Sequence, residues 1–127
     1  MDLALWIAAG VLGVVALMGG ITKTFLPLAK LGAHEGGQWT THADPVLVRT
    51  LGVLELLAAA GLVLPAVLDV ATVMVPVTAA CWVALMIGAM LMHLRFRQIG
   101  LTVLCLGYLS VAVFVAWGRF GPESFGA

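Results

Sequence analysis

The chain has 127 residues, of which 63% are hydrophobic and 9% are charged, and its six basic and six acidic side chains cancel. A soluble domain needs about a quarter of its residues charged to cover its surface, so this composition excludes a water-soluble fold. No basic cluster points to nucleic acid or to a polybasic lipid-binding tail. The apolar content allows four membrane spans of about 20 residues each and excludes a sizeable aqueous domain.

Four apolar runs divide the chain, at residues 3–21, 46–64, 70–92 and 99–117. Each is long enough to cross a hydrocarbon core of about 30 Å at about 1.5 Å per residue. The first run lacks the basic residues of a secretory signal peptide, so we expect a retained helix. The sequence therefore predicts an all-α polytopic membrane protein, an antiparallel four-transmembrane-helix bundle in a single domain.

Local signals predict where the two middle helices begin and end. Asp44 followed by Pro45 is typical of an N-cap and a first helical position. Pro65 is expected to end that helix because a proline interrupts helical hydrogen bonding. Asp69 is expected to be the N-cap of the next helix, and Pro76 is expected to kink it near its start.

The connections differ in length and in charge. Short turns at 65–69 and 94–98 predict helix hairpins, whereas residues 22–44 are expected to form a long polar loop that carries any water-facing recognition surface. Five basic residues lie on the side of 22–44 and 94–98, and only Arg119 lies on the other side. By the positive-inside rule, both connections are expected in the cytoplasm and both termini outside. The five basic residues are Lys23, Lys30, Arg49, Arg95 and Arg97.

Glu55 lies nine residues after the start of the second run, which is about 13 Å along the helix axis and close to the bilayer midplane. Tyr108 lies at a matching depth on the fourth run, and Trp82 falls near the middle of the third. Intramembrane carboxylates are functional by default, and the neighbouring Gly52 and Ala59 leave room for a partner helix or a ligand head group. The alternative is a protonated Glu55, bonded to Tyr108 or a backbone carbonyl, that only holds helices together.

Two further polar residues lie near the membrane surface. Arg49 is offset from Glu55 by about 120° around the helix, so it is expected to reach the head groups or pair with a loop acid. His93 lies where the third helix leaves the membrane, and it is expected to be interfacial, with a proton relay to Glu55 as the alternative.

The remaining candidates carry little signal. Cys81 and Cys105 are expected to be buried free thiols, since their depths differ by roughly 5 Å or more and thus argue against a disulfide. The spacing of the acidic and histidine residues of the polar loop matches no known metal motif, so no metal site is predicted. These residues are His34, Glu35, His42 and Asp44.

The order of these elements is similar to that of the DoxX-like family of small bacterial membrane proteins. The matching features are Gly19-Gly20 before Lys23, then the polar segment, then Arg49 followed by residues 52–57 (GVLELL) and 61–65 (GLVLP), and a third helix that ends in Gly88-Ala89 and His93. The resemblance covers nearly the whole chain.

The resemblance implies a four-helix bundle in a bacterial plasma (inner) membrane, with Glu55 as the characteristic polar position of the second helix and His93 at the end of the third. Members are linked to membrane redox systems, among them quinone-reducing thiosulfate oxidation and thiol or oxidative-stress complexes. The fold also looks like that of sterol-isomerase-type bundles, which act on apolar ligands. This chain departs from the redox members in lacking a paired-cysteine motif and an extended soluble region.

The leading hypothesis is a small membrane protein that binds a lipophilic molecule, of quinone or isoprenoid type, or supports a membrane redox partner. Glu55 would exchange a proton and Tyr108 would orient the ligand's carbonyl or hydroxyl group. The predicted ligand-binding residues are Arg49, Gly52, Ala59, Trp82 and His93.

Two alternatives from other classes stay open. One is a structural subunit without ligand, in which Glu55 only fixes helix packing. The other is a proton-coupled exporter of small hydrophobic compounds. The sequence leaves open whether a reaction is catalysed, which protein is the partner, and whether the chain forms a homo-oligomer.

Overall fold

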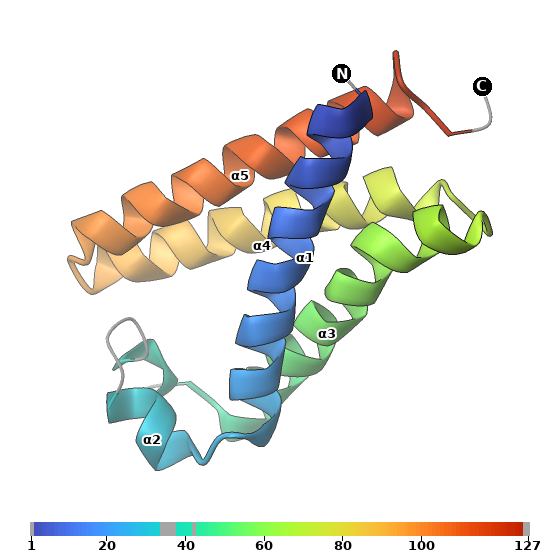
Figure 1. Ribbon diagram of the computed structural model, residues 1–127. Coiled ribbons are helices and arrows are strands. Elements are labelled where there is room, and N and C mark those ends of the chain that lie inside the picture. Colours follow the sequence, from blue (N-terminus) through green and yellow to red (C-terminus); the bar gives the residue numbers. More distant parts are fainter. Residues whose placement is uncertain (1, 34–37, 42, 126–127) are drawn as a thin grey trace.

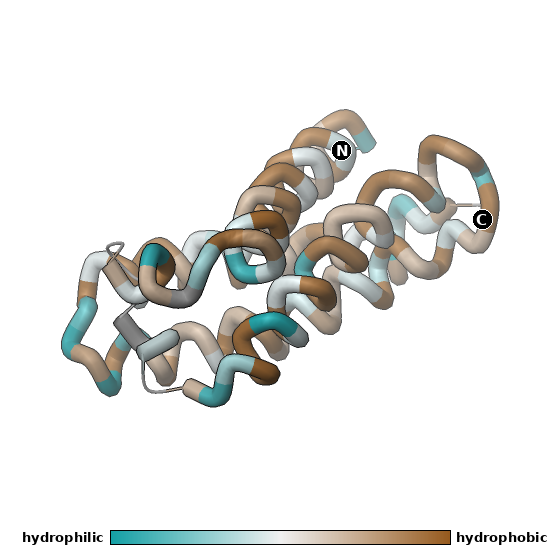
Figure 2. Tube along the Cα trace, turned by 90° about the horizontal axis from the view of Figure 1, so that it is seen from below, coloured by the Kyte–Doolittle hydropathy of each residue, from teal (hydrophilic) through white to brown (hydrophobic). Residues whose placement is uncertain are grey.

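The computed structural model describes residues 2–33, 38–41 and 43–125. Across these residues each of the four long helices is long and apolar enough to cross a membrane, and Figure 2 shows hydrophobic residues along all of them. The protein is therefore an all-helical, multi-pass membrane protein, as predicted. Its elements are α1 (Asp2–Phe25), α2 (Leu28–Ala33), the 3-10 helix η1 (Gln38–Thr41), α3 (Pro45–Leu68), α4 (Met74–Arg95) and α5 (Ile99–Phe120).

Helix α3 begins as predicted but ends later. The Asp44 side chain accepts a hydrogen bond of 2.8 Å from the Val46 backbone N–H, and Pro45 occupies the first turn. The helix then continues through Pro65 to Leu68, so the prediction that Pro65 ends it is wrong. A proline one turn from a helix end removes one hydrogen bond, and the apolar packing of the span outweighs this loss.

Asp69 ends α3 and does not begin α4, which corrects the predicted role of this residue. It adopts a left-handed conformation (φ 53°), and its N–H donates to the Ala66 and Pro65 carbonyls. Helix α4 therefore begins at Met74 instead of near residue 70. Pro76 then lies in the first turn, where the backbone N–H has no helical partner in any case.

Much of the polar segment 22–44, predicted as a loop, is helical among the residues that the structure describes. Its first residues, up to Phe25, belong to α1, and it also contains α2 and η1. Leu31 of α2 and Thr40 of η1 are both buried. The segment therefore contributes side chains to the interior, whereas other residues of it, such as Lys30 and Thr41, are exposed.

The helices pack as two pairs, α1 with α3 and α4 with α5, and the two pairs contact each other less extensively. In Figure 1, α4 and α5 run side by side, α1 crosses them near both chain termini, and α3 diverges from α4 after their shared turn. The two pairs therefore lie close together near the termini and separate toward the end of the molecule that carries α2.

Glycines allow the closest helix contacts. A Cβ at Gly118 would lie 2.5 Å from the Leu5 side chain, where α5 meets α1, and one at Gly61 would lie 2.5 Å from Thr78 Oγ1, where α3 meets α4. Small residues of this kind drive helix association in lipid, where no hydrophobic effect acts between helices.

An ion pair joins the two ends of the chain. The buried Arg119 guanidinium donates a hydrogen bond of 2.7 Å to Asp2 and one of 2.9 Å to the Glu123 carbonyl, and it lies 4.0 Å from the centre of the Phe125 ring. These contacts hold the start of α1 against the end of α5.

Candidate functional site

A cavity of about 650 Å³ lies where the two helix pairs separate. All four long helices contribute to its walls, and Leu31 of α2 and Thr40 of η1 also line it. Most of the lining is apolar. Its larger polar side chains are Lys23, Glu55, Trp82, His93 and Tyr108.

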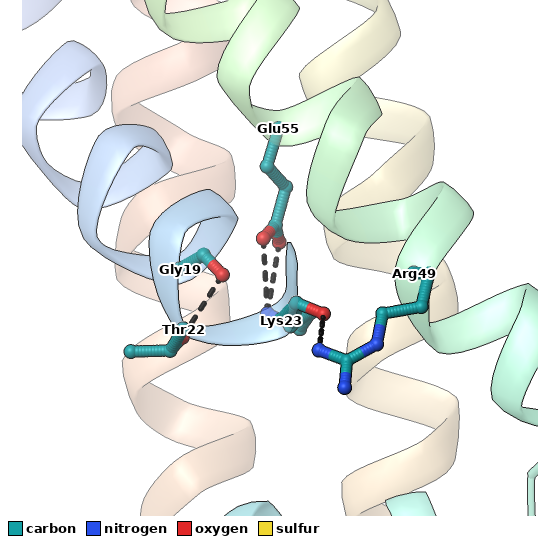
Figure 3. Close-up of polar contacts among 5 residues, drawn as sticks. All are labelled: Gly19, Thr22, Lys23, Arg49 and Glu55. Carbon is teal, nitrogen blue, oxygen red and sulfur yellow. Dashed lines mark hydrogen bonds and ion pairs between the residues drawn. The ribbon is translucent and has the colours of Figure 1, made fainter. Parts of the chain in front are cut away.

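An ion pair between Lys23 and Glu55 is the most polar feature of this cavity. The Lys23 Nζ lies 3.1 Å from Glu55 Oε1 and 3.0 Å from Oε2, so one ammonium group donates to both carboxylate oxygens (Figure 3). Glu55 is only 6% exposed, and the Lys23 side chain is 22% exposed. A carboxylate this deep in apolar surroundings requires such a partner.

The sequence analysis identified Glu55 but missed Lys23. The sequence places Lys23 only among the basic residues of one membrane side, because the first apolar run ends at residue 21. In the structure α1 continues to Phe25, so Lys23 lies within the helix. The pairing depends on the register of α1 against α3, for which the sequence holds no direct signal.

Gly19 provides the space that the carboxylate occupies. A Cβ at this position would lie 2.9 Å from Glu55 Oε2 and 3.4 Å from Lys23 Nζ. Any side chain at Gly19 would push against the ion pair, whereas a Cβ at Gly20 would lie 2.8 Å from Leu56 of α3.

Arg49 fixes the end of α1 and does not line the cavity. Its Nη1 donates to the Lys23 carbonyl at 2.9 Å and to the Leu26 carbonyl at 2.7 Å (Figure 3 shows the first of these). Lys23 lies in the last turn of α1 and Leu26 directly after it, and a cation near the carbonyls of a helix end is favourable. Arg49 therefore holds the end of α1 and the backbone of Lys23, and its predicted contact with head groups stays a prediction.

The other predicted ligand-binding residues lie either in the interface between α1 and α3 or in the wall of the cavity. Gly52 and Ala59 lie in the interface of α1 and α3, against Thr24 and Gly13 respectively. Small residues beside Glu55 thus accommodate a partner helix, whereas Trp82 and His93 line the cavity together with Tyr108.

The polar groups of the cavity wall differ in their hydrogen-bond partners. His93 Nδ1 donates a hydrogen bond of 2.8 Å to Gln98 Oε1, which leaves Nε2 as an acceptor in the neutral ring. Trp82 is 2% exposed, and its Nε1–H has no hydrogen-bond partner in the described part of the chain. Among the described residues the Glu55 carboxylate is bonded to Lys23 and not to Tyr108, contrary to the alternative in which a protonated Glu55 bonds to Tyr108.

The two cysteines are free and lie in different surroundings. Cys105 is buried and lines the cavity, while Cys81 is exposed on the outside of α4, so the prediction of two buried thiols is wrong for Cys81. Of the residues considered for metal binding, His34, Glu35 and His42 lie outside the described residues.

The cavity reaches the outer surface at its side. Leu47 of α3 and Ala84 and Gly88 of α4 line it and are also exposed. Beyond Gly88 there is open space, because no atom lies within 4 Å of a Cβ built there. In a bilayer this surface faces the hydrocarbon chains, so a molecule dissolved in the membrane meets the cavity directly.

We compared this four-helix membrane protein, which carries a buried carboxylate on α3, with known proteins. Neither the comparison with curated proteins nor that with solved structures found a match. The pattern of the DoxX-like family matches residues 7–115, a range that runs from α1 to α5 and includes Lys23 and Glu55. The chain, with its paired helices and its intramembrane ion pair, belongs to the DoxX-like family.

Proposed function

We propose that the protein binds a lipophilic molecule of quinone or isoprenoid type in the cavity between the two helix pairs. One observation carries this proposal: an apolar cavity of about 650 Å³, open toward the lipid, contains a buried ion pair. Binding sites for small molecules combine apolar walls with a few convergent polar groups and typically enclose about 300–1,000 Å³.

The cavity lining fits such a ligand. Val15, Leu85, Met86 and Met92 offer apolar contacts to a ring or an isoprenoid chain. Lys23 and Tyr108 offer hydrogen-bond donors to its oxygen atoms, and His93 Nε2 offers an acceptor to a hydroxyl group. Glu55 holds the Lys23 ammonium at the cavity wall by two hydrogen bonds. Tyr108 also lines the cavity, which supports the proposal that it orients a carbonyl or hydroxyl group of the ligand.

A structural role without ligand is the second candidate. The ion pair links α1 to α3, and this link alone would account for Glu55. The two candidates differ in whether the cavity holds a ligand. Lipophile binding requires a bound molecule there, whereas a purely structural Glu55 requires none.

The test is native mass spectrometry of the protein taken from its own membrane in nanodiscs. We expect the wild-type protein to carry a bound lipophile and the Glu55→Gln variant to lose that species, because the Lys23 ammonium is no longer held in place. The Gly107→Trp variant, changed at an exposed position outside the cavity with open space around it, serves as the control and should keep the ligand. Wild-type protein without any bound lipophile would contradict the proposal and favour the structural role.

The side opening makes a separate prediction about rates. In the Gly88→Trp variant the indole can occupy the open space at the mouth of the cavity, so uptake and release of the ligand should both become about tenfold slower. The measurement is the time course of photolabelling by an alkyl ketone that carries a diazirine, with Gly107→Trp as the matched control. Equal rates in Gly88→Trp and wild type would show that ligands enter by another route.

We further propose that the protein lies in a bacterial inner membrane with both termini outside. The excess of basic residues near α2 and the α4–α5 turn supports this orientation. In Figure 1 these two regions lie toward one side of the molecule and the two termini toward another.

A further inference from the structure

We infer that the cavity selects a lipophile with an uncharged oxygen-bearing head group, such as a ketone, and discriminates against fatty acids, phosphorylated isoprenoids and amines. This inference rests on the proposed function and narrows its ligand class. It is derived from the ion pair and from the other groups that face the cavity.

The charges facing the cavity cancel. Among the described residues that line it, Lys23 is the only Lys or Arg and Glu55 the only Asp or Glu, and the two are bonded to each other. Arg49 is occupied with the carbonyls at the end of α1 and does not line the cavity. The site thus has no net charge to offer an ionic ligand.

An anionic ligand would have to compete with Glu55 for Lys23. If it displaced the carboxylate, Glu55 would become an unpaired charge that is only 6% exposed. An unpaired buried charge is strongly unfavourable in a low dielectric. A cationic ligand that displaced Lys23 from Glu55 would leave the Lys23 ammonium without its counter-charge, at a lower cost because the Lys23 side chain is 22% exposed. In both cases an ionic ligand has to break an ion pair before it can form a new one.

An uncharged oxygen atom of a ligand can accept a hydrogen bond from an N–H of Lys23 that does not bond to Glu55. The ammonium of lysine has three N–H groups, and the two contacts made by Lys23 Nζ both go to Glu55. In the described part of the chain this leaves one N–H of Lys23 for a ligand. A ketone or ester oxygen accepts that hydrogen bond without disturbing the pair.

The experiment compares three photoreactive probes with the same alkyl chain and diazirine: a methyl ketone, a carboxylate and a primary amine. Each is added to the full-length protein in nanodiscs, irradiated, and located by peptide mass spectrometry. Labelling of cavity peptides is divided by labelling of the outer faces of the same helices, which corrects for partition into the bilayer. In the wild-type protein the ketone should exceed both ionic probes by about tenfold.

The Glu55→Gln variant should reverse this order. It leaves Lys23 without a counter-charge, so the carboxylate should then label the cavity more than the ketone does. Gly107→Leu, a change outside the cavity, should keep the wild-type order.

The outcomes distinguish failure of the selection for uncharged ligands from failure of lipophile binding itself. A wild-type cavity that labels equally with ketone and carboxylate, or an unchanged order in Glu55→Gln, overturns the selection for uncharged ligands and leaves lipophile binding intact. Labelling of the outer faces alone by all three probes overturns the proposed function and this inference with it. The wild-type measurement stands without the variant if Glu55→Gln fails to fold.

Discussion

Replacing Gly52 by leucine is expected to lower the stability of the protein by about 3 kcal/mol or more. A Cβ at this position would lie 2.5 Å from Thr24 Oγ1, 2.7 Å from the Thr24 backbone nitrogen and 2.9 Å from the Lys23 carbonyl carbon. Backbone atoms cannot move aside as a flexible side chain can, so α1 and α3 must separate. That separation would also pull Lys23 away from Glu55, because both residues lie next to this contact.

The measurement is unfolding in mixed micelles by titration with dodecyl sulfate, followed by circular dichroism. Gly107→Leu is the matched control, because no atom lies within 4 Å of its Cβ position, and it should change stability by no more than about 0.5 kcal/mol. Gly52→Ala should already be destabilised, since the clash involves the Cβ itself. If Gly52→Leu unfolded at the same detergent concentration as Gly107→Leu, the close approach of α1 and α3 would be refuted.

The sequence predicted the spans because they depend on composition and length alone. Runs of about 20 apolar residues have one stable arrangement in a bilayer, since every backbone group must be satisfied within the segment. The N-cap at Asp44 was also predictable, because a side chain that bonds two residues ahead acts locally.

Helix ends that depend on distant residues were not predictable. Helix α1 passes residue 21 and continues to Phe25, and Arg49 of α3 bonds to the carbonyls of Lys23 and Leu26 at this end from more than twenty residues away in the chain. The sequence predicts that Asp69 begins one helix, whereas it ends another, because Asp is acceptable both as an N-cap and in the left-handed conformation of a C-cap.

The candidate site was predicted in part. Depth along each helix brought Glu55, Trp82 and Tyr108 to one level, and all three line the cavity. Depth says nothing about rotation around the helix axis or about which helices form pairs. For this reason the sequence could not show that Lys23 pairs with Glu55 or that Gly52 faces α1.

Replacing Lys23 by methionine is expected to destabilise the protein by about 2–4 kcal/mol, because the deeply buried Glu55 carboxylate then lacks its partner. Glu55→Met should cost less, about 1–2 kcal/mol, since the Lys23 side chain is 22% exposed and can reach water through its flexible stem.

The double variant Lys23→Met/Glu55→Met decides what the ion pair contributes. Two apolar side chains of similar volume replace the pair without leaving a charge behind, so its stability should lie within about 1 kcal/mol of wild type. The two single changes would then be strongly non-additive, and the difference measures the coupling between the side chains. Additive losses in the dodecyl sulfate titration would mean that the two groups do not interact across the α1–α3 interface.

The ion pair at the other end of the molecule supplies a comparison. Asp2 is 58% exposed, but the side chain of its partner Arg119 is only 3% exposed. Asp2→Asn removes the counter-charge of this buried guanidinium but keeps an amide oxygen that can accept its hydrogen bond, so the variant should cost about 1–2 kcal/mol. The comparison therefore tests whether a neutral acceptor can replace a carboxylate beside a buried cation. The cost of leaving Glu55 unpaired is also what should keep ionic lipids out of the cavity, so a small effect of Lys23→Met would weaken the argument for an uncharged ligand as well.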